Sequence, residues 1–277
     1  MADPVPVTAV VLSHNEAENL PRCLRALRDC AEVVVIDDGS TDDSRRMAAG
    51  CGARVVSHPF VSFADQRNWA MDAAGLRYDW VLHLDADEVM TPAALEEIRL
   101  RLPSMTSGSA GFLARKVILE GQWLRFSADY PVHVPRLLHR AGLRYVMRGH
   151  GEVLASKPGE SVFFDEPMLH YNFSKGWAEW RVRHLRYAIA EAVRIRSGAA
   201  SFSLRALFSA DRTERRAALR ALSYRLPGRP ALRFLYAYVL RMGCLDGVQG
   251  LRFCLAMASY ERMIDAALCG QEVTKAP

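Results

Sequence analysis

The sequence Trp-Val-Leu-His-Leu-Asp-Ala-Asp-Glu, residues 80–88, carries the strongest structural signal in this chain. Its first five residues are mostly apolar and predict a buried strand, which Asp85 and Asp87 follow. Residues i and i+2 of a strand point to the same face, so the two carboxylates would repel each other without a cation between them. Carboxylate oxygens suit Mg²⁺ or Mn²⁺, often shared with substrate phosphates. The stretch therefore predicts a metal site at a strand end, whereas an isolated pair of acids is more often a solvated turn.

The first hundred residues alternate predicted strands with predicted helices. The strands are 7–13, 33–36, 54–57 and 80–84, and the helices are 19–28, Ser40 or Thr41 to Gly50, 63–74 and one that begins at Thr91-Pro92. This alternation predicts an α/β fold with a parallel sheet covered by helices. In such sheets ligands bind at the carboxyl ends of the strands. Three of the four strands end in polar residues, at 13–16, 37–38 and 85–87, which indicates one shared site.

The pattern changes after residue 110 to short predicted strands at 111–120, 135–139 and 168–171. Residues from 176 onward read as helices, with 177–196 as the first. We therefore predict two domains, 1–175 and 176–277. The chain lacks an uninterrupted apolar stretch of transmembrane length and a secretory leader pattern. Its six cysteines form no Cys-x-x-Cys pair and are typical of reduced core residues in the cytosol.

The net charge of +5 is unevenly distributed along the chain. Residues 175–277 hold 18 Lys or Arg and 8 Asp or Glu, a balance of +10, whereas residues 1–174 have a balance of −5. Sixteen of those 18 basic residues are arginine. A basic half of this kind suits phospholipid headgroups, a phosphorylated substrate or nucleic acid. The plainer interpretation is a solvated helix face with ordinary core contacts.

Taken together, the strand ends resemble glycosyltransferase family 2, whose catalytic domain has the GT-A fold. The resemblance rests on SHNEAEN at 13–19, VIDDGSTD at 35–42, ADQRNWA at 64–70 and LDADE at 84–88. LHYNFSKG at 169–176 and LDGVQG at 245–250 are similar to the bacterial branch that builds lipopolysaccharide core and exopolysaccharide. The resemblance implies an α/β, Rossmann-like mixed sheet of the nucleotide-diphospho-sugar transferase type. It also implies a C-terminal helical extension that faces a membrane or the acceptor.

By this resemblance the strand ends bind a nucleotide-sugar donor, with uridine as the usual base of the family. The residues implied for donor binding are Asn15, Glu16, Asp37, Asp38, Gly39, Gln66, Arg67, Asn68 and Arg136. Within that set, Asp37 or Asp38 accepts a hydrogen bond from uracil or ribose. Gln66, Arg67 and Asn68 open a helix near the diphosphate, where arginine pairs bidentately with phosphate. Asp85 and Asp87 hold Mg²⁺ or Mn²⁺, with Asp87 as the more direct ligand.

An inverting transfer also needs a carboxylate that takes the proton of the acceptor hydroxyl. Many relatives place an aspartate after a Tyr-Pro pair, but here Val132 stands at that position and cannot act as a base. The resemblance makes Glu152 the first candidate and Asp129 the second. His150 would orient Glu152 or contact the acceptor.

The predicted function is metal-dependent, inverting transfer of a sugar from a nucleoside-diphosphate donor to a cell-envelope glycan or lipid-linked acceptor. The predicted location is cytoplasmic and peripheral, on the anionic cytoplasmic face of the inner membrane. One alternative is a sugar nucleotidyltransferase, although a glycine-rich phosphate loop is missing near the first strand. A dinucleotide-binding dehydrogenase is excluded because the turn after the first strand, residues 13–16, is Ser-His-Asn-Glu rather than Gly-x-Gly-x-x-Gly. A nucleic-acid-binding protein using the basic half would show steeply salt-dependent binding to DNA.

Overall fold

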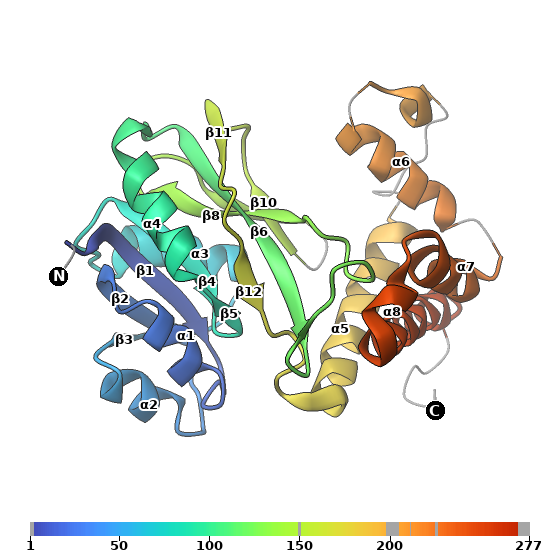
Figure 1. Cartoon of the computed structure of the whole chain (residues 1–277), viewed down its shortest axis with the longest axis horizontal. Coiled ribbons are helices and arrows are strands. Elements are labelled where there is room, and N and C mark those ends of the chain that lie inside the picture. The colour runs from blue at the N-terminus through green and yellow to red at the C-terminus, as the bar shows by residue number, and fades with distance from the viewer. Residues whose placement is uncertain (1–2, 149–150, 198–204, 211, 225–226, 271–277) are drawn as a thin grey trace. The chain divides into compact units, whose positions relative to one another are not determined.

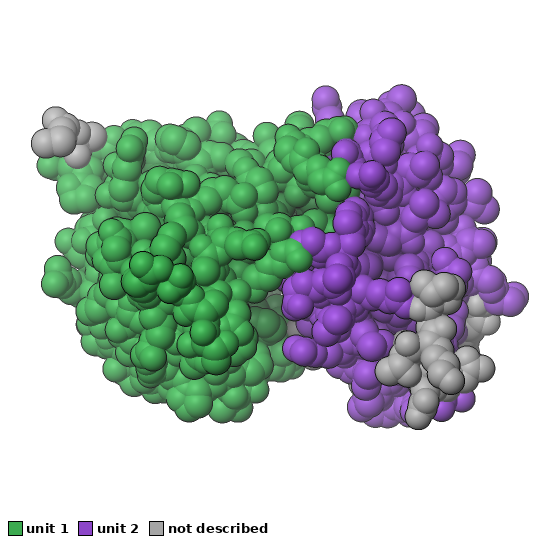
Figure 2. Space-filling model, turned by 90° about the horizontal axis from the view of Figure 1, so that it is seen from below, with its two compact units in different colours: residues 1–123, 129–175 green, residues 124–128, 176–277 purple. Residues whose placement is uncertain are grey.

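The computed structural model describes residues 3–148, 151–197, 205–210, 212–224 and 227–270. The chain divides into two compact units, which Figure 2 shows in different colours. Unit 1 comprises residues 1–123 and 129–175, and unit 2 comprises residues 124–128 and 176–277. Unit 1 contains all the strands, and unit 2 is helical in its described part (Figure 1).

A parallel half-sheet forms the first part of unit 1. Its strands are β1 (Val5–Ser13), β2 (Cys30–Asp37), β3 (Arg54–Ser57) and β4 (Trp80–Asp85). They pair in parallel in the order β3-β2-β1-β4. The connecting helices are α1 (Leu20–Ala26), α2 (Ser44–Gly50) and α3 (Phe63–Ala73), and α4 (Pro92–Arg101) follows β4. The predicted βαβαβαβα order is confirmed.

Alternation along β1 explains why helices cover both faces of this half-sheet. Ala9 and Val11 belong to one buried cluster, which also contains residues of α1 and α4. Val10 and Leu12 belong to a second buried cluster, which also contains Met71 of α3. Because successive strand residues point to opposite faces, a strand that is apolar throughout must be covered on both sides.

The second half of the sheet runs largely antiparallel. Its strands are β5 (Glu88–Val89), β6 (Ser109–Leu119), β7 (Gln122–Trp123), β8 (His133–His139), β11 (Glu160–Phe163) and β12 (Met168–His170). β8 pairs antiparallel with β4, and the order continues β8-β6-β12-β5. β9 (Tyr145–Arg148) and β10 (Gly151–Leu154) form a separate antiparallel pair. The sheet is therefore mixed, as the GT-A fold requires.

Unit 2 is built from helices around a small core. Its helices are α5 (Gly176–Arg196), α6 (Arg212–Ser223), α7 (Arg229–Leu235), the π-helical η3 (Tyr236–Leu240) and α8 (Gly247–Leu268). Two 3-10 turns, η2 (Arg205–Phe208) and η4 (Gly243–Asp246), also lie in unit 2. A further 3-10 turn, η1 (Leu102–Ser104), lies in unit 1. Ala188 packs with Met263 and Ile264 in the core of unit 2. Among the described residues, no helix combines the length with the apolar character needed to cross a membrane.

Three local predictions need correction. α2 begins at Ser44 rather than near Ser40, because the Asp42 carboxylate accepts hydrogen bonds from Ser44 N and Oγ. β4 extends one residue further than predicted, to Asp85, and a turn follows it. The cysteines are not all core residues, since Cys51, Cys244 and Cys269 are exposed. By contrast, Thr91 caps α4 as predicted, with its side chain accepting from Ala94 N.

Candidate functional site

The carboxyl ends of β1, β2 and β4 meet at one edge of the sheet. Ser13 at the end of β1 lies opposite Asp37 of β2, and Leu12 lies opposite Asp85 of β4. Because all three strands are parallel, the segments that follow them leave the sheet on the same side. The structure thus brings together the residues predicted at 14–16, 37–39 and 85–87.

The two aspartates that follow β2 have different surroundings. Asp37 is 1% exposed; its Oδ2 accepts a hydrogen bond from Ser40 N, 3.1 Å away. Its Oδ1 is buried and accepts no hydrogen bond from the described residues. The Asp38 side chain is 26% exposed, and its Oδ1 accepts from Phe60 N at 2.8 Å. Gly39 has φ +64°, a left-handed conformation that glycine adopts without strain.

The loop that follows β1 is fixed to the loop that follows β2. Asn15 has φ 53°, uncommon for a residue with a side chain, and its Oδ1 accepts from Thr41 N at 2.8 Å. Glu16 Oε1 lies 2.5 Å from Lys175 Nζ, and its Oε2 accepts from Asn19 Nδ2. Burial raises the pKa of Glu16, and the bonds from Lys175 and Asn19 oppose this. The two loops therefore form one ordered rim of the site.

Asp87 lies beside a histidine to which the sequence analysis gave no role. Its Oδ2 is 3.6 Å from His170 Nε2, and its backbone oxygen accepts from Tyr171 N at 2.8 Å. β12 pairs antiparallel with β5, with His170 opposite Glu88, and this pairing places His170 next to Asp87. The available sequence signal was the LHY stretch at 169–171, which ends a short predicted strand.

Asp87 and His170 offer one oxygen and one nitrogen donor to a divalent cation. Within the described ranges, His, Cys, Asp and Glu side chains do not gather in threes around a possible metal position. An all-protein metal cage is therefore not formed by these residues. Mg²⁺ and similar ions are commonly bound by one or two protein groups together with substrate phosphates and water. The pair fits a metal of that kind.

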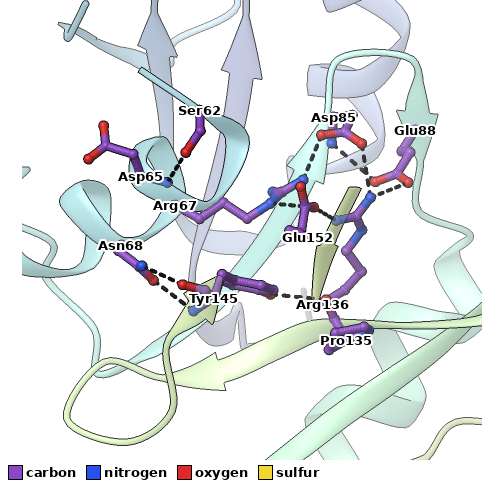
Figure 3. A network of polar contacts seen from close by, with 10 residues as sticks. All are labelled: Ser62, Asp65, Arg67, Asn68, Asp85, Glu88, Pro135, Arg136, Tyr145 and Glu152. Atoms are coloured by element: carbon purple, nitrogen blue, oxygen red, sulfur yellow. Dashed lines mark hydrogen bonds and ion pairs between the residues drawn. The ribbon is translucent and has the colours of Figure 1, made fainter. Parts of the chain in front are cut away.

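A network of charged side chains surrounds the end of β4 (Figure 3). Arg67 of α3 is wholly buried and contacts Asp85 Oδ1 at 2.6 Å and Glu152 Oε1 at 2.9 Å. Arg136 of β8 contacts Asp85 Oδ2 at 2.9 Å, Glu88 Oε1 at 2.6 Å and Glu152 Oε1 at 3.1 Å. Two guanidinium groups thus hold three carboxylates, which come from β4, β5 and β10.

Attraction between the opposite charges shifts the pKa values of Asp85 and Arg136. Burial alone would raise the pKa of Asp85, but the charges of Arg136 and Arg67 hold it well below its ordinary value. Burial alone would lower the pKa of Arg136, but Glu88, Asp85 and Glu152 raise it well above its ordinary value. Asp85 and Arg136 therefore stay ionised at neutral pH. Counted formally, two arginines and three carboxylates sum to a charge of −1.

The network gives several of the predicted site residues partners within the protein. Asp85 is predicted to share the metal; both of its oxygens accept hydrogen bonds from arginine, and a turn follows it before Asp87. Arg67 and Arg136 were expected at the nucleotide, but both are buried against carboxylates. Gln66 donates to His58 O, and Asn68 exchanges two hydrogen bonds with the backbone of Tyr145. All four side chains therefore bind other groups of the protein.

The candidate bases occupy different settings. Glu152 is 14% exposed, and its Oε1 receives both arginines. Asp129 is partly exposed and lies between β7 and β8, next to a cis Tyr130–Pro131 peptide bond. His150 lies outside the described residues. The structure thus links Glu152 to the strand-end acid Asp85 through Arg67 and Arg136.

Comparison with known proteins gives partial matches. The lipopolysaccharide core biosynthesis glycosyltransferase LpsC of Rhizobium meliloti (strain 1021) is 28% identical over 169 residues, 58% of each chain. An uncharacterized glycosyltransferase of Rickettsia bellii (strain RML369-C) is 32% identical over 33% of this chain and 31% of its own length. The chain therefore spans less than two thirds of these curated relatives.

Among solved structures, glucosyl-3-phosphoglycerate synthase from Mycobacterium tuberculosis, in complex with Mn²⁺, uridine diphosphate and glucosyl-3-phosphoglycerate, is 21% identical. The similarity covers 40% of this chain and 44% of that chain, with a TM-score of 0.34. The family described as glycosyl transferase family 2 matches residues 8–136. That range contains β1, β2 and β4, whose ends meet at the candidate site, so the part of the chain that carries those strand ends is similar to glycosyl transferase family 2.

Proposed function

We propose that this protein transfers a sugar from a nucleoside-diphosphate donor, with uridine diphosphate as the nucleotide, to a cell-envelope glycan or lipid-linked acceptor. The observation that supports this most is the meeting of the β1, β2 and β4 ends within the matched family range. Asp37 and Asp38 lie at the turn after β2, and Asp87, which follows β4, lies beside His170. A sugar nucleotidyltransferase or a nucleic-acid-binding protein explains that arrangement less well.

The nucleoside is proposed to bind at the turn after β2. Asp38 is the accessible member of the aspartate pair, and its carboxylate can accept from the imide N–H of uracil or from a ribose hydroxyl. Asp37 is turned inward and holds the turn through Ser40 N. Asn15 and Glu16 form the adjacent rim, where their own hydrogen bonds keep the β1 loop in place.

The diphosphate is proposed to bind beside Asp87 and His170, which would hold Mg²⁺ or Mn²⁺ with it. When bound, the metal neutralises the charge that develops on the departing nucleoside diphosphate. The chain's own contribution is to fix the two donors: β5 and β12 pair next to Asp87, and Tyr171 N binds its backbone oxygen. The charged side chains of the network have a formal sum of −1, which also favours a cation here.

Glu152 is proposed as the base of an inverting transfer. Arg67 and Arg136 anchor it through Oε1, so that Oε2 is the oxygen available for the proton of the acceptor hydroxyl. An anchored carboxylate keeps its orientation, which general-base catalysis requires. Asp129 is the second candidate, since it lies next to the Tyr-Pro pair at which relatives carry an acid.

The charge of the second unit and the name of one relative support the proposals for the acceptor and the location. The name of LpsC connects that protein with lipopolysaccharide core biosynthesis, and we propose an envelope acceptor for this chain. The +10 balance of residues 175–277 suits the anionic cytoplasmic face of the inner membrane. We therefore propose peripheral attachment at that face.

A nucleotide panel tests the donor proposal. Thermal unfolding of the full chain is followed with uridine, guanosine, cytidine and adenosine diphosphates, each with and without Mn²⁺. The proposal expects one nucleotide, uridine diphosphate, to raise the unfolding temperature, and Mn²⁺ to enlarge the shift. If all four nucleotides leave the temperature unchanged in both conditions, the donor assignment is wrong.

A further inference from the structure

Unit 2 exposes a continuous stretch of large apolar side chains along α7, η3, η4 and the start of α8. We call it the apolar surface of unit 2. Its members are Leu232, Leu235, Tyr236, Val239, Leu240, Met242, Leu245 and Val248, and each is between 46% and 76% exposed. Contiguous exposed apolar patches of this kind mark interaction sites in folded proteins.

Within α7 and η3, the helical spacing places the exposed apolar residues of 232–240 on one side of the segment. Leu232 is followed at three or four residue steps by the pairs 235–236 and 239–240, which is the spacing of one helix face. The opposite side is used for packing. Arg229 is buried against Glu261 and Asp265, and Ala237 is 1% exposed.

Two further contacts fix this orientation. The Asp246 carboxylate, 3% exposed, accepts hydrogen bonds from the backbone N–H groups of residues 125–127. Gly243 packs so closely that a Cβ there would lie 2.6 Å from Ala237 O. The apolar residues are therefore held outward by packing on their inner side, rather than left over at a frayed end.

The exposed charges within the stretch that carries the apolar surface are of one sign. Between residues 231 and 252 the basic residues are Arg233, Arg241 and Arg252, and the single acid is Asp246. Asp246 is buried and turned inward, so this stretch exposes arginine and no carboxylate. A second copy of this chain would bring arginine against arginine. An anionic lipid leaflet instead provides an apolar interior beneath phosphate groups, which matches both features.

We infer that the apolar surface of unit 2 inserts into the headgroup and acyl boundary of an anionic bilayer, with Arg233, Arg241 and Arg252 at the level of the phosphates. The inference rests on the proposed peripheral location and goes further. It assigns the attachment to particular residues and attributes the binding free energy to apolar burial as well as to charge. It is independent of the donor and acceptor.

Vesicle flotation tests this with the full chain. The vesicles are phosphatidylethanolamine with phosphatidylglycerol, and pure phosphatidylcholine serves as the neutral comparison. The test variant combines Leu240→Glu with Val248→Glu, at positions 76% and 65% exposed. The matched control is Leu100→Glu, at a position 70% exposed on α4 of unit 1. Because all three side chains are exposed, the thermal unfolding of both variants should match that of the wild type.

The wild type and Leu100→Glu should float with the anionic vesicles, and the double variant should partition at least about tenfold more weakly. If the double variant floats like the wild type, apolar insertion is wrong while peripheral attachment stands. If the wild type floats on neither vesicle, both are wrong. If the wild type forms a dimer in solution that the double variant abolishes, and flotation is equal, the surface binds a second copy instead.

Discussion

Arg136 Nη2 bridges two carboxylates of different exposure, lying 2.9 Å from Asp85 Oδ2 and 2.6 Å from Oε1 of the fully buried Glu88. One β8 side chain thereby fixes the end of β4 and the start of β5, the strand beside which His170 lies. Asp85 is thus held within the network by two arginines, whereas Asp87 lies beside His170.

Replacing Arg136 should destabilise the fold strongly. Arg136→Met leaves Glu88 buried without its counter-charge, and breaking one partner of a buried pair costs about 3–5 kcal/mol in the free energy of unfolding. Arg140→Met removes an exposed pair with Asp79 and should cost at most about 1 kcal/mol. Urea unfolding of both variants checks this. Equal, small losses would show that the network is not a structural support.

His83 should make stability depend on pH. Burial first, and then Arg67 and Arg136, hold its pKa well below the ordinary 6.5, so the folded protein keeps it neutral while the unfolded chain binds a proton. This contribution is present above pH 6.5 and is lost as pH falls towards the lowered value. Between pH 7.5 and 5.5 it should amount to about 1.4 kcal/mol, which His83→Leu removes from the pH dependence. Urea unfolding at both pH values measures it, and identical pH dependence in the two proteins would contradict it.

Asp38 should contribute to nucleotide affinity without metal. Asp38→Ala removes a charged acceptor, and such hydrogen bonds contribute about 1.5–3 kcal/mol, so uridine diphosphate should bind about 10- to 100-fold more weakly in chelator. The matched control is Asp43→Ala, whose exposed carboxylate pairs with Arg46. Calorimetric titration distinguishes the two. If Asp43→Ala weakens binding as much as Asp38→Ala, the turn after β2 does not read the nucleoside.

Glu152→Gln should separate catalysis from binding. The amide keeps the shape of the side chain but cannot take a proton, and a positioned base contributes about 10²–10⁴-fold to rate. Turnover should fall by that order while the donor dissociation constant changes little, and Asp129→Asn should be mild. The opposite pattern would transfer the role to Asp129. A product that retains the donor's anomeric configuration would rule out single displacement.

The parallel half-sheet could be predicted because β1, β2 and β4 are mostly apolar and the helices between the strands have local signals. β3 and the Thr91 cap of α4 match the prediction in detail. The short strands β5, β7, β9, β10 and β11 were missed, since two to four residues carry too little periodicity and their pairing depends on distant partners.

The same limit applies to the site. Its acidic residues follow from the strand ends, but the partners of Asp85 lie 18 and 51 residues away in sequence. Nothing in a local pattern distinguishes an arginine that binds phosphate from one that is buried against carboxylates. The role of His170 depends on the β5–β12 pairing, which only the fold supplies.

The most direct test of the central claim is release of nucleoside diphosphate from a panel of sugar donors, measured with Mn²⁺ and with chelator for the wild type and for Asp87→Ala. The wild type should consume at least one uridine-diphosphate sugar with Mn²⁺. Chelator or Asp87→Ala should remove nearly all of this release while thermal unfolding without ligand is unchanged. Full release in chelator, or from the Asp87→Ala protein, would contradict the claim.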